Sequence, residues 1–229
     1  MPKVLEIECP FRGWASNREH PLLKLGLTGG IASGKSAVGE MFVKRGAFLI
    51  QSDAVAHALM QPGRPVHDEV VRCFGGEILN ADGTVNRSRL AEAAFGSGSA
   101  PPRVKELNEI VHPAVIDEEN KWMEEIGRRN PKAIAVVEAA LILEAGAAGR
   151  FNRLIVVTCH PEQRIQRFAR RLGISEDAAR AEVMRRMAAQ IPDEEKVKAA
   201  DFVIDNSGSL DATEEQVERV FAALRQRRL

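Results

Sequence analysis

The chain has 229 residues, and its 32 lysines and arginines are matched by 32 aspartates and glutamates. This neutral balance argues against binding to nucleic acid or to a membrane surface, because both need a strong basic excess. Since 45% of the residues are apolar, the chain can form a sizeable core and is not expected to be disordered.

Residues 1–22 are expected to form an N-terminal extension, because they lack the hydrophobic core of a signal peptide. No apolar run in the chain reaches the 18 residues of a membrane span. The three cysteines are widely spaced and form no CxxC pattern, so neither a disulfide framework nor a zinc site is expected. These features predict a reducing, cytoplasmic compartment.

The first regular elements are predicted to be a strand, a loop, a helix and a second strand. The apolar run 22–27 predicts a buried strand that enters a glycine-rich loop, and residues 47–50 predict the second strand. Gly46 is expected to end the helix between them. This opening is typical of an α/β fold. The helix positions expected to share one face are Val38, Met41, Phe42 and Arg45.

Residues 54–130 are predicted to be a helical insertion beside the sheet, because the next apolar strand comes only at residues 133–137. Asn86 is expected to cap a helix that runs to about Phe95. A longer amphipathic helix is predicted from Val104 to Gly127. Pro113 should kink or break it, because proline has no backbone N–H.

A second run of alternating strands and helices follows. Residues 154–157 and 202–204 predict two more strands, which makes about five, and their continuous apolarity predicts a parallel sheet covered by helices on both sides. Pro161 can begin a helix that Gly173 ends. The residues expected on the buried stripe of that helix are Ile165, Phe168, Ala169 and Leu172.

The last two helices are predicted from their starts. Ser175 is expected to cap the first of them. Asp211 and Glu214 resemble a capping box for the final helix. The residues of that final helix that are expected to face inward are Val217, Val220, Phe221 and Leu224.

The glycine-rich loop matches the pattern GxxxxGK[ST] from Gly29 to Ser36. Its glycines let the backbone curl so that successive N–H groups point at phosphate oxygens, and the following helix adds the positive end of its dipole. In this motif the lysine, Lys35, bridges the β- and γ-phosphates, and the hydroxyl of Ser36 is a Mg²⁺ ligand. The sequence therefore predicts binding of a nucleoside triphosphate.

Three carboxylates are candidates for chemistry at the edge of the sheet, where ligands bind in such folds. Asp53 follows the second strand, where it could orient or deprotonate an acceptor hydroxyl, or could cap the next helix. Glu138 follows the third strand and could hold Mg²⁺ through water, and Glu144 is a second candidate nearby. For Glu138 and Glu144 a solvated strand end is the alternative.

Arginines are dense between residues 164 and 186. Arg167 shares a helix face with Arg164 and with Arg171, so the three could stabilise the charge of a phosphoryl group in transfer. The alternative is an exposed face paired with acidic neighbours. The histidines His57 and His112 form no metal-binding pattern and are more often structural.

The chain resembles the dephospho-coenzyme A kinase family over about residues 23–210, and the combination of segments is more specific than the loop alone. The resemblance rests on Gly26–Ser36, Asp53–His57, Phe74-Gly75, Asp82-Gly83, Asn86-Arg87-x-x-Leu90, Leu107-Asn108-x-Ile110-x-His112-Pro113, Leu141–Glu144, Gln190, Lys196 and Ala200–Gly208. The departures are Ala140 and Leu143, where the family usually has proline and phenylalanine, and Arg164, where it commonly has glutamine.

The resemblance implies transfer of phosphate from ATP, with Mg²⁺, to the ribose 3′-hydroxyl of dephospho-coenzyme A. The catalytic residues it implies are Lys35, Asp53, Arg167 and Arg171. The nucleotide would be bound by Gly29, Gly30, Ile31, Ala32, Ser33, Gly34, Lys35, Ser36, Ala37 and Asn206, the last at the adenine. The acceptor would be bound by Asp53, His57, Arg87, His112 and Leu141. Ser36 and Glu138 would hold the metal.

The resemblance also implies a P-loop kinase domain over residues 23–229. Its core is expected at residues 23–53, 131–160 and 199–229, with an acceptor-binding insertion at 54–130 and a lid at 161–198. A kinase for another small acceptor, or a nucleotide-binding regulator without transferase activity, remains an alternative. A monomer and a homo-oligomer are both left open.

Overall fold

The computed structural model describes residues 22–96 and 102–226, which form two compact units. The described residues of Met1–Leu49 and Ile126–Leu229 form one of them, which we call the sheet unit. Residues Ile50–Glu125 form the other, which we call the insert unit. The predicted extension, residues 1–22, lies outside the described residues except for its last one.

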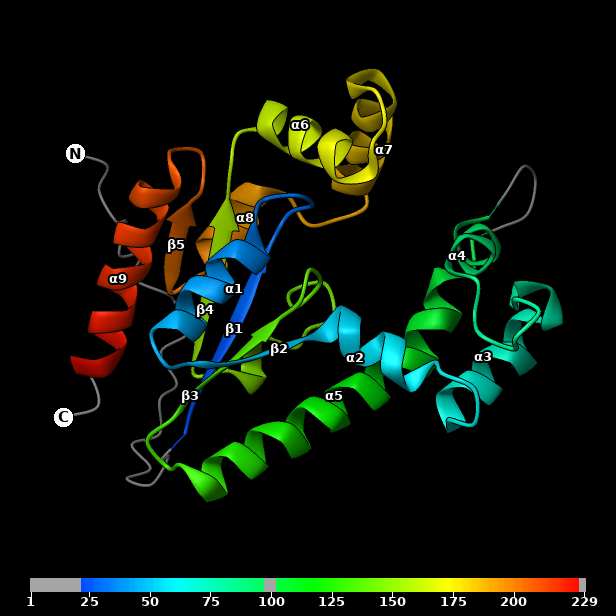
Figure 1. The fold of residues 1–229 in the computed structure, drawn as a ribbon, viewed down its shortest axis with the longest axis horizontal. Helices are drawn as coiled ribbons and strands as arrows, with labels where there is room; N and C mark the ends of the chain where they lie inside the picture. Colours follow the sequence, from blue (N-terminus) through cyan, green and yellow to red (C-terminus); the bar gives the residue numbers. More distant parts are fainter. Residues whose placement is uncertain (1–21, 97–101, 227–229) are drawn as a thin grey trace. The chain divides into compact units, whose positions relative to one another are not determined.

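The sheet has five strands in the order β2-β3-β1-β4-β5, as Figure 1 shows. The three pairs β1–β3, β1–β4 and β4–β5 are parallel, which confirms the predicted fold class. The strands that adjoin β1 are buried almost throughout, whereas Phe48 in the edge strand is 43% exposed. The strands are β1 (Leu23–Gly29), β2 (Phe48–Gln51), β3 (Ile134–Glu138), β4 (Arg153–Thr158) and β5 (Phe202–Asp205).

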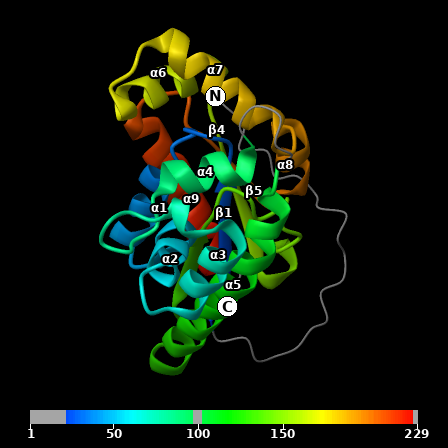
Figure 2. The same cartoon turned by 90° about the vertical axis from the view of Figure 1, so that its right-hand side faces the viewer.

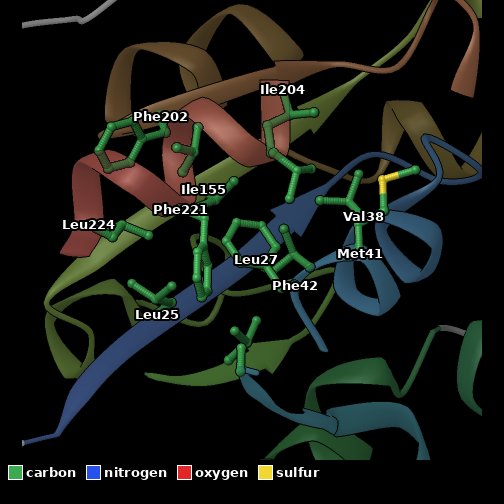
Figure 3. Close-up of a cluster of buried hydrophobic side chains, with 14 of the residues drawn as sticks. Leu25, Leu27, Val38, Met41, Phe42, Ile155, Phe202, Ile204, Phe221 and Leu224 are labelled. Atoms are coloured by element: carbon green, nitrogen blue, oxygen red, sulfur yellow. The ribbon is translucent and has the colours of Figure 1, made fainter. Parts of the chain in front are cut away.

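Helices cover both faces of the sheet. Successive side chains of a strand point to opposite faces, and those of β4 belong to two different apolar clusters. Ile155 and Val157 belong to the cluster under α1 (Lys35–Lys44) and α9 (Leu210–Gln226), part of which Figure 3 draws. Leu154 and Val156 belong to a second cluster, which includes residues next to and within α8 (Asp193–Ala199). The rings of Phe42 and Phe221 join α1 to α9, with centroids 6.1 Å apart.

Helices α6 (Pro161–Leu172) and α7 (Glu176–Ala188) pack against each other. Ser175 caps α7 as predicted, since its hydroxyl accepts a hydrogen bond from the backbone N–H of Ala178 at 3.3 Å. The predicted stripe on α6 is buried except for Leu172, which is 53% exposed because it lies in the last turn, beyond the reach of the core. The cluster between the helices includes Ile31 from the glycine-rich loop.

The insert unit is helical, as Figure 2 shows from the side of α2, α3 and α4. Its elements are α2 (Ser52–Leu59), α3 (Pro65–Phe74), α4 (Arg87–Phe95) and most of α5 (Val104–Arg129), with a short 3₁₀ turn at Gly76–Ile78; a second such turn, Ala148–Arg150, lies in the sheet unit. Asn86 caps α4 as predicted, by accepting hydrogen bonds from the N–H groups of Ser88 and Arg89, each at 3.1 Å.

Two predictions about helix boundaries differ from the structure. Helix α5 continues through Pro113, so the predicted break does not occur; Val111 and Val115 on either side are buried in the core of the insert unit and help to offset the lost hydrogen bond. Asp211 does not open a capping box. Helix α9 begins at Leu210, and the Ser209 hydroxyl accepts from the N–H of Ala212 at 3.2 Å instead.

None of the helices in residues 22–96 and 102–226 is both long and apolar enough to cross a bilayer.

Candidate active site

The glycine-rich loop joins β1 to α1 and has the backbone shape that anion binding requires. Ala32 and Gly34 have positive φ values of 53° and 93°, so the chain turns sharply before α1 begins. Gly34 precedes the first turn of α1 and offers no side chain to cap it, which is the arrangement that lets an anion cap a helix N-terminus. A β-carbon at Gly34 would lie 2.0 Å from Nδ2 of Asn206, so the position has no room for one.

Lys35 is folded back over this loop. Its Nζ donates hydrogen bonds to the carbonyl oxygens of Gly29 at 3.0 Å and Gly30 at 3.1 Å. The ammonium is therefore held at the mouth of the loop, next to the N-terminus of α1. A cation and a helix N-terminus at one place attract the same ligand, a polyanion.

Ser36 and Glu138 are joined directly. The Ser36 hydroxyl donates to Oε1 of Glu138 at 2.6 Å, and Glu138 is 8% exposed. Glu138 is the last residue of β3, rather than the first one after it as predicted. The parallel pairing of β3 with β1 places it opposite Leu27, next to the loop. The two residues predicted to hold a metal thus present hard oxygen ligands at one point, which is the donor set that Mg²⁺ prefers.

Glu144, the other candidate carboxylate, belongs to a different network. Its Oε1 accepts from Nζ of Lys196 at 2.9 Å and from the backbone N–H of Ile191 at 3.1 Å. Lys196 is fully buried and also donates to Oε1 of Gln190 at 2.9 Å. This ion pair fastens the connection between α7 and α8 to the loop after β3. Glu144 is therefore not joined to Ser36 as Glu138 is.

Arg167 and Asn206 hold the backbone of the glycine-rich loop at Ser33 through hydrogen bonds. Arg167 donates to the carbonyl oxygen of Ser33 at 3.3 Å and to that of Asn206 at 2.8 Å. The side-chain amide of Asn206 donates to the same Ser33 oxygen at 2.9 Å, and its Oδ1 accepts from the hydroxyl of Thr213 at 3.0 Å. Asn206 is 4% exposed, and these bonds make it a support of the loop. The adenine contact expected of it stays a prediction.

The three candidate arginines of α6, Arg164, Arg167 and Arg171, lie in three different environments. Arg171 is exposed, and its guanidinium lies 5.3 Å from the centre of the Phe168 ring. Arg167 is docked on the loop, and Arg164 is 1% exposed and paired with Asp193. The predicted exposed face is therefore wrong for Arg164. The sequence did hold a signal for its burial, because Arg164 precedes Phe168 by four residues and so lies at the edge of the buried stripe.

Asp53 is exposed on the insert unit. It is the second residue of α2, and Gln51 occupies the capping position, so the helix-cap alternative for Asp53 is wrong. Within the described part of the chain its carboxylate has no hydrogen bond or ion pair. A carboxylate that no structural role occupies remains available to an acceptor hydroxyl.

A pocket of about 450 Å³ in the insert unit brings together two of the predicted acceptor residues, His57 and Arg87. His112 is not among its lining residues. It is half-buried, and desolvation lowers its pKa, although the nearby carboxylate of Glu119 acts in the opposite direction. Leu141 lies in the sheet unit, in the loop after β3. The other lining residues are Gln61, Asn80, Thr84, Val85, Asn86 and Ser88.

Comparison with known proteins gives one consistent answer. The family model described as dephospho-CoA kinase matches residues 23–212. A dephospho-CoA kinase of Syntrophotalea carbinolica is 40% identical over 210 residues, which span 89% of this chain and 92% of that protein. One of Corynebacterium efficiens is 38% identical over 203 residues, or 89% of this chain and 98% of that protein.

The fold agrees with this match. A crystal structure from Thermus thermophilus superposes with a TM-score of 0.71 at 34% identity, and covers 90% of this chain and 99% of its own. The family match spans the glycine-rich loop, Asp53, the pocket that contains His57 and Arg87, and the three candidate arginines of α6. The chain therefore belongs to the dephospho-CoA kinase family.

Proposed function

We propose that the protein transfers the γ-phosphoryl group of ATP to the ribose 3′-hydroxyl of dephospho-CoA, which yields CoA and ADP in the last step of CoA synthesis. The observation that carries the proposal is the glycine-rich loop with Lys35 folded over it, in a chain whose residues 23–212 match this kinase family. The geometry of the loop supplies the triphosphate site, and the family supplies the acceptor.

The nucleotide would be held by the loop from Gly29 to Ala37. Its N–H groups and the N-terminus of α1 would bind phosphate oxygens, and Lys35 would exchange its two carbonyl partners for the β- and γ-phosphates. This exchange costs little, because the ammonium already lies at the loop. Asn206 and Arg167 would keep the backbone of Ser33 in place while the anion binds.

Ser36 and Glu138 would hold Mg²⁺, since the two oxygens lie 2.6 Å apart and the carboxylate is almost fully buried beside the loop. Mg²⁺ held by these residues would supply positive charge that offsets the negative charge of the triphosphate. The residues of this chain would provide one hydroxyl and one carboxylate. Such a small protein share is usual for Mg²⁺ in kinases.

Asp53 would orient the 3′-hydroxyl and accept its proton. Because phosphoryl transfer passes through a loose transition state, positioning should contribute more than base strength. Arg167 and Arg171 would stabilise the charge on the group in transfer. Arg167 is already held at the loop. The exposed Arg171 would reach the transferring group only when the lid, residues 161–198, closes and excludes water.

The insert unit would bind dephospho-CoA. The pocket that contains His57 and Arg87 is lined mainly by polar side chains, and Arg87 is exposed at the N-terminus of α4. This chemistry suits an anionic part of the acceptor, such as its diphosphate. His112 and Leu141 stay proposed acceptor contacts that do not line this pocket. The cytoplasmic location also stays a prediction.

The test is ADP release by purified protein with ATP and Mg²⁺, with and without dephospho-CoA. We expect strong stimulation by dephospho-CoA, none by adenosine monophosphate or gluconate, and loss of the stimulation in Lys35→Ala. Stimulation by another acceptor would favour a kinase with a different substrate. ATP binding without stimulation by any acceptor would overturn the proposal and leave a nucleotide-binding regulator.

A further inference from the structure

Arg164 is a buried charge that the proposed mechanism leaves unused. It is 1% exposed, its Nη2 forms an ion pair with Asp193, and Nε and Nη2 each lie 3.4 Å from the carbonyl oxygen of Cys159. Its remaining terminal nitrogen, Nη1, is buried and has no hydrogen-bond partner within the described residues. A side chain whose every other donor is occupied is fixed in orientation, so the direction of Nη1 is a built feature.

The guanidinium packs against Gly30 of the glycine-rich loop. A β-carbon at Gly30 would lie 2.1 Å from Nη1 and 3.0 Å from Cζ of Arg164, and 3.3 Å from Oδ1 of Asp193. Gly30 does not have a positive φ, so its need for glycine is one of space alone. The nearest atoms in that direction all belong to the Arg164–Asp193 pair, and the pair therefore occupies the place of a side chain on Gly30.

Gly30 in turn carries the groups that shape the nucleotide site. Its carbonyl oxygen accepts from Nζ of Lys35 at 3.1 Å and from the backbone N–H of Ser33 at 3.3 Å. A shift of Gly30 would therefore move both the ammonium and the turn of the loop. The Arg164–Asp193 pair bears on the loop at the residue where these two contacts meet.

The other end of the pair rests on an anchored helix. Asp193 is the first residue of α8, and three residues later Lys196 ties α8 to Glu144 through the buried ion pair described above. Asp193 is thus a fixed support, and Arg164 spans the distance from it to Gly30. The Arg164–Asp193 pair therefore links the start of α8 to Gly30 of the glycine-rich loop. We call this contact the brace.

Stability alone does not explain this arrangement. A buried ion pair is often no more stable than a well-packed apolar pair, and a buried N–H without a partner lowers stability further. We infer that Arg164 is a positioning residue of the nucleotide site, which acts through Gly30 to hold the glycine-rich loop in the shape that binds a triphosphate. The inference rests on the proposed function of that loop, but not on the identity of the acceptor.

The test is a double-mutant cycle on Gly30 and Arg164, with the ATP dissociation constant measured by calorimetry in the absence of acceptor. Arg164→Ala removes the brace, and Gly30→Ala pushes it away, so each change should weaken ATP binding about tenfold. In Arg164→Ala the space beside Gly30 is open, so adding Gly30→Ala should cost no further ATP affinity. The double variant should therefore bind ATP at least as tightly as whichever single variant binds it less tightly. Additive losses, or an Arg164→Ala protein with unchanged affinity, would overturn the inference.

Two further variants and one kinetic measurement separate positioning from a general loss of structure. Arg180→Ala removes an exposed pair with Glu162 between α6 and α7 and should leave ATP affinity unchanged. Arg164→Lys keeps a cation of similar length beside Asp193 and should recover part of the affinity. In turnover assays the KM for ATP should rise in Arg164→Ala while the KM for dephospho-CoA stays constant; an equal rise in both would contradict the inference.

The design also covers two kinds of failure. If Arg164→Ala does not fold, Gly30→Ala with an intact melting transition still tests the brace, and unchanged ATP affinity there would refute it. If dephospho-CoA proves not to be the acceptor, the calorimetric cycle is unaffected, because it needs ATP alone. A failure of the proposed function and a failure of the brace therefore give different results.

Discussion

The proposed nucleotide site and the proposed acceptor site are built in opposite ways. In the sheet unit, Lys35, Ser36 and Arg167 each make a hydrogen bond of 3.3 Å or less to the loop or to the strand beside it. In the insert unit, Asp53 and Arg87 are exposed, and neither makes a hydrogen bond or ion pair with the described residues. The side chains at the loop are already ordered by contacts within the protein, whereas Asp53 and Arg87 would become ordered only when a ligand binds.

This difference decides when the side chains of each site lose their conformational freedom. On the nucleotide side, folding has already ordered the donors, so ATP binding needs little rearrangement. On the acceptor side, the side chains lose conformational freedom only when the acceptor binds. Changes to the residues that hold the glycine-rich loop should therefore affect stability, ATP binding and turnover together, whereas changes to Asp53 and Arg87 should leave folding intact.

The sharpest test of this contrast is Asp53→Asn. Because Asp53 is exposed and supports no other residue, the variant should fold with an unchanged melting temperature. Loss of the carboxylate should lower kcat by about 10² to 10⁴, the usual range for a general base. Steady-state kinetics with a matched thermal melt measures both. A near-normal kcat would remove Asp53 from the chemistry.

In contrast to Asp53, the buried ion pair Lys196–Glu144 of the sheet unit should contribute to the stability of the fold. Lys196→Met leaves the Glu144 carboxylate buried without its cation, so the free energy of unfolding should fall by about 3 kcal/mol. Urea denaturation measures this loss. Lys105→Met is the matched control, because it removes an exposed pair with Glu109 in the insert unit and should change stability little. Equal effects of the two changes would contradict the contrast.

A smaller effect is expected from Arg87→Gln in the pocket of the insert unit. The change removes a charge and leaves a shorter polar side chain, so the KM for dephospho-CoA should rise about tenfold. The ATP dissociation constant should stay as it is. A rise in ATP Kd instead, with the acceptor KM unchanged, would show that the pocket serves the nucleotide.

The smallest predicted effect is a pH dependence of stability at His67. Its Nδ1 lies 3.1 Å from the carboxylate of Asp68 and its Nε2 lies 3.0 Å from the carbonyl oxygen of Gly83, and both acceptors raise its pKa. The protonated ring is thus favoured in the folded state. Its contribution should be complete below pH 6.5, the ordinary pKa, and should be lost as the pH rises through the higher folded value.

The measurement is the urea midpoint of the wild type and of His67→Gln from pH 5.5 to 8.5. The difference between them should be largest at the acidic end and should shrink toward the alkaline end, by about 1 kcal/mol at most because Asp68 is exposed. A difference that grows with pH would have the wrong sign for this account.

The sequence predicted those features that depend on neighbours in the chain. The five strands, the cap at Asn86 and the loop from Gly29 to Ser36 follow from local patterns of apolar residues, glycines and capping side chains. Local patterns also misled at Asp211, where two capping signals lie two residues apart and Ser209 accepts the hydrogen bond. Which of two adjacent caps is used depends on how α9 packs.

The parts that sequence reasoning missed depend on residues far apart. The burial of Arg164 requires Asp193, which lies 29 residues later and reaches it only after α7 has returned the chain to the core. The partner of Glu144 could not be predicted for the same reason, since Lys196 reaches that carboxylate only in the folded protein. No spacing along the chain encodes such a pairing.

The most direct test of the central claim is the identity of the product. Purified protein would be incubated with ATP, Mg²⁺ and dephospho-CoA, and the products examined by mass spectrometry and phosphorus NMR. The account predicts that the acceptor gains one phosphoryl group as a ribose 3′-phosphomonoester, with one ADP formed for each. Release of ADP with free phosphate and an unaltered acceptor would contradict it.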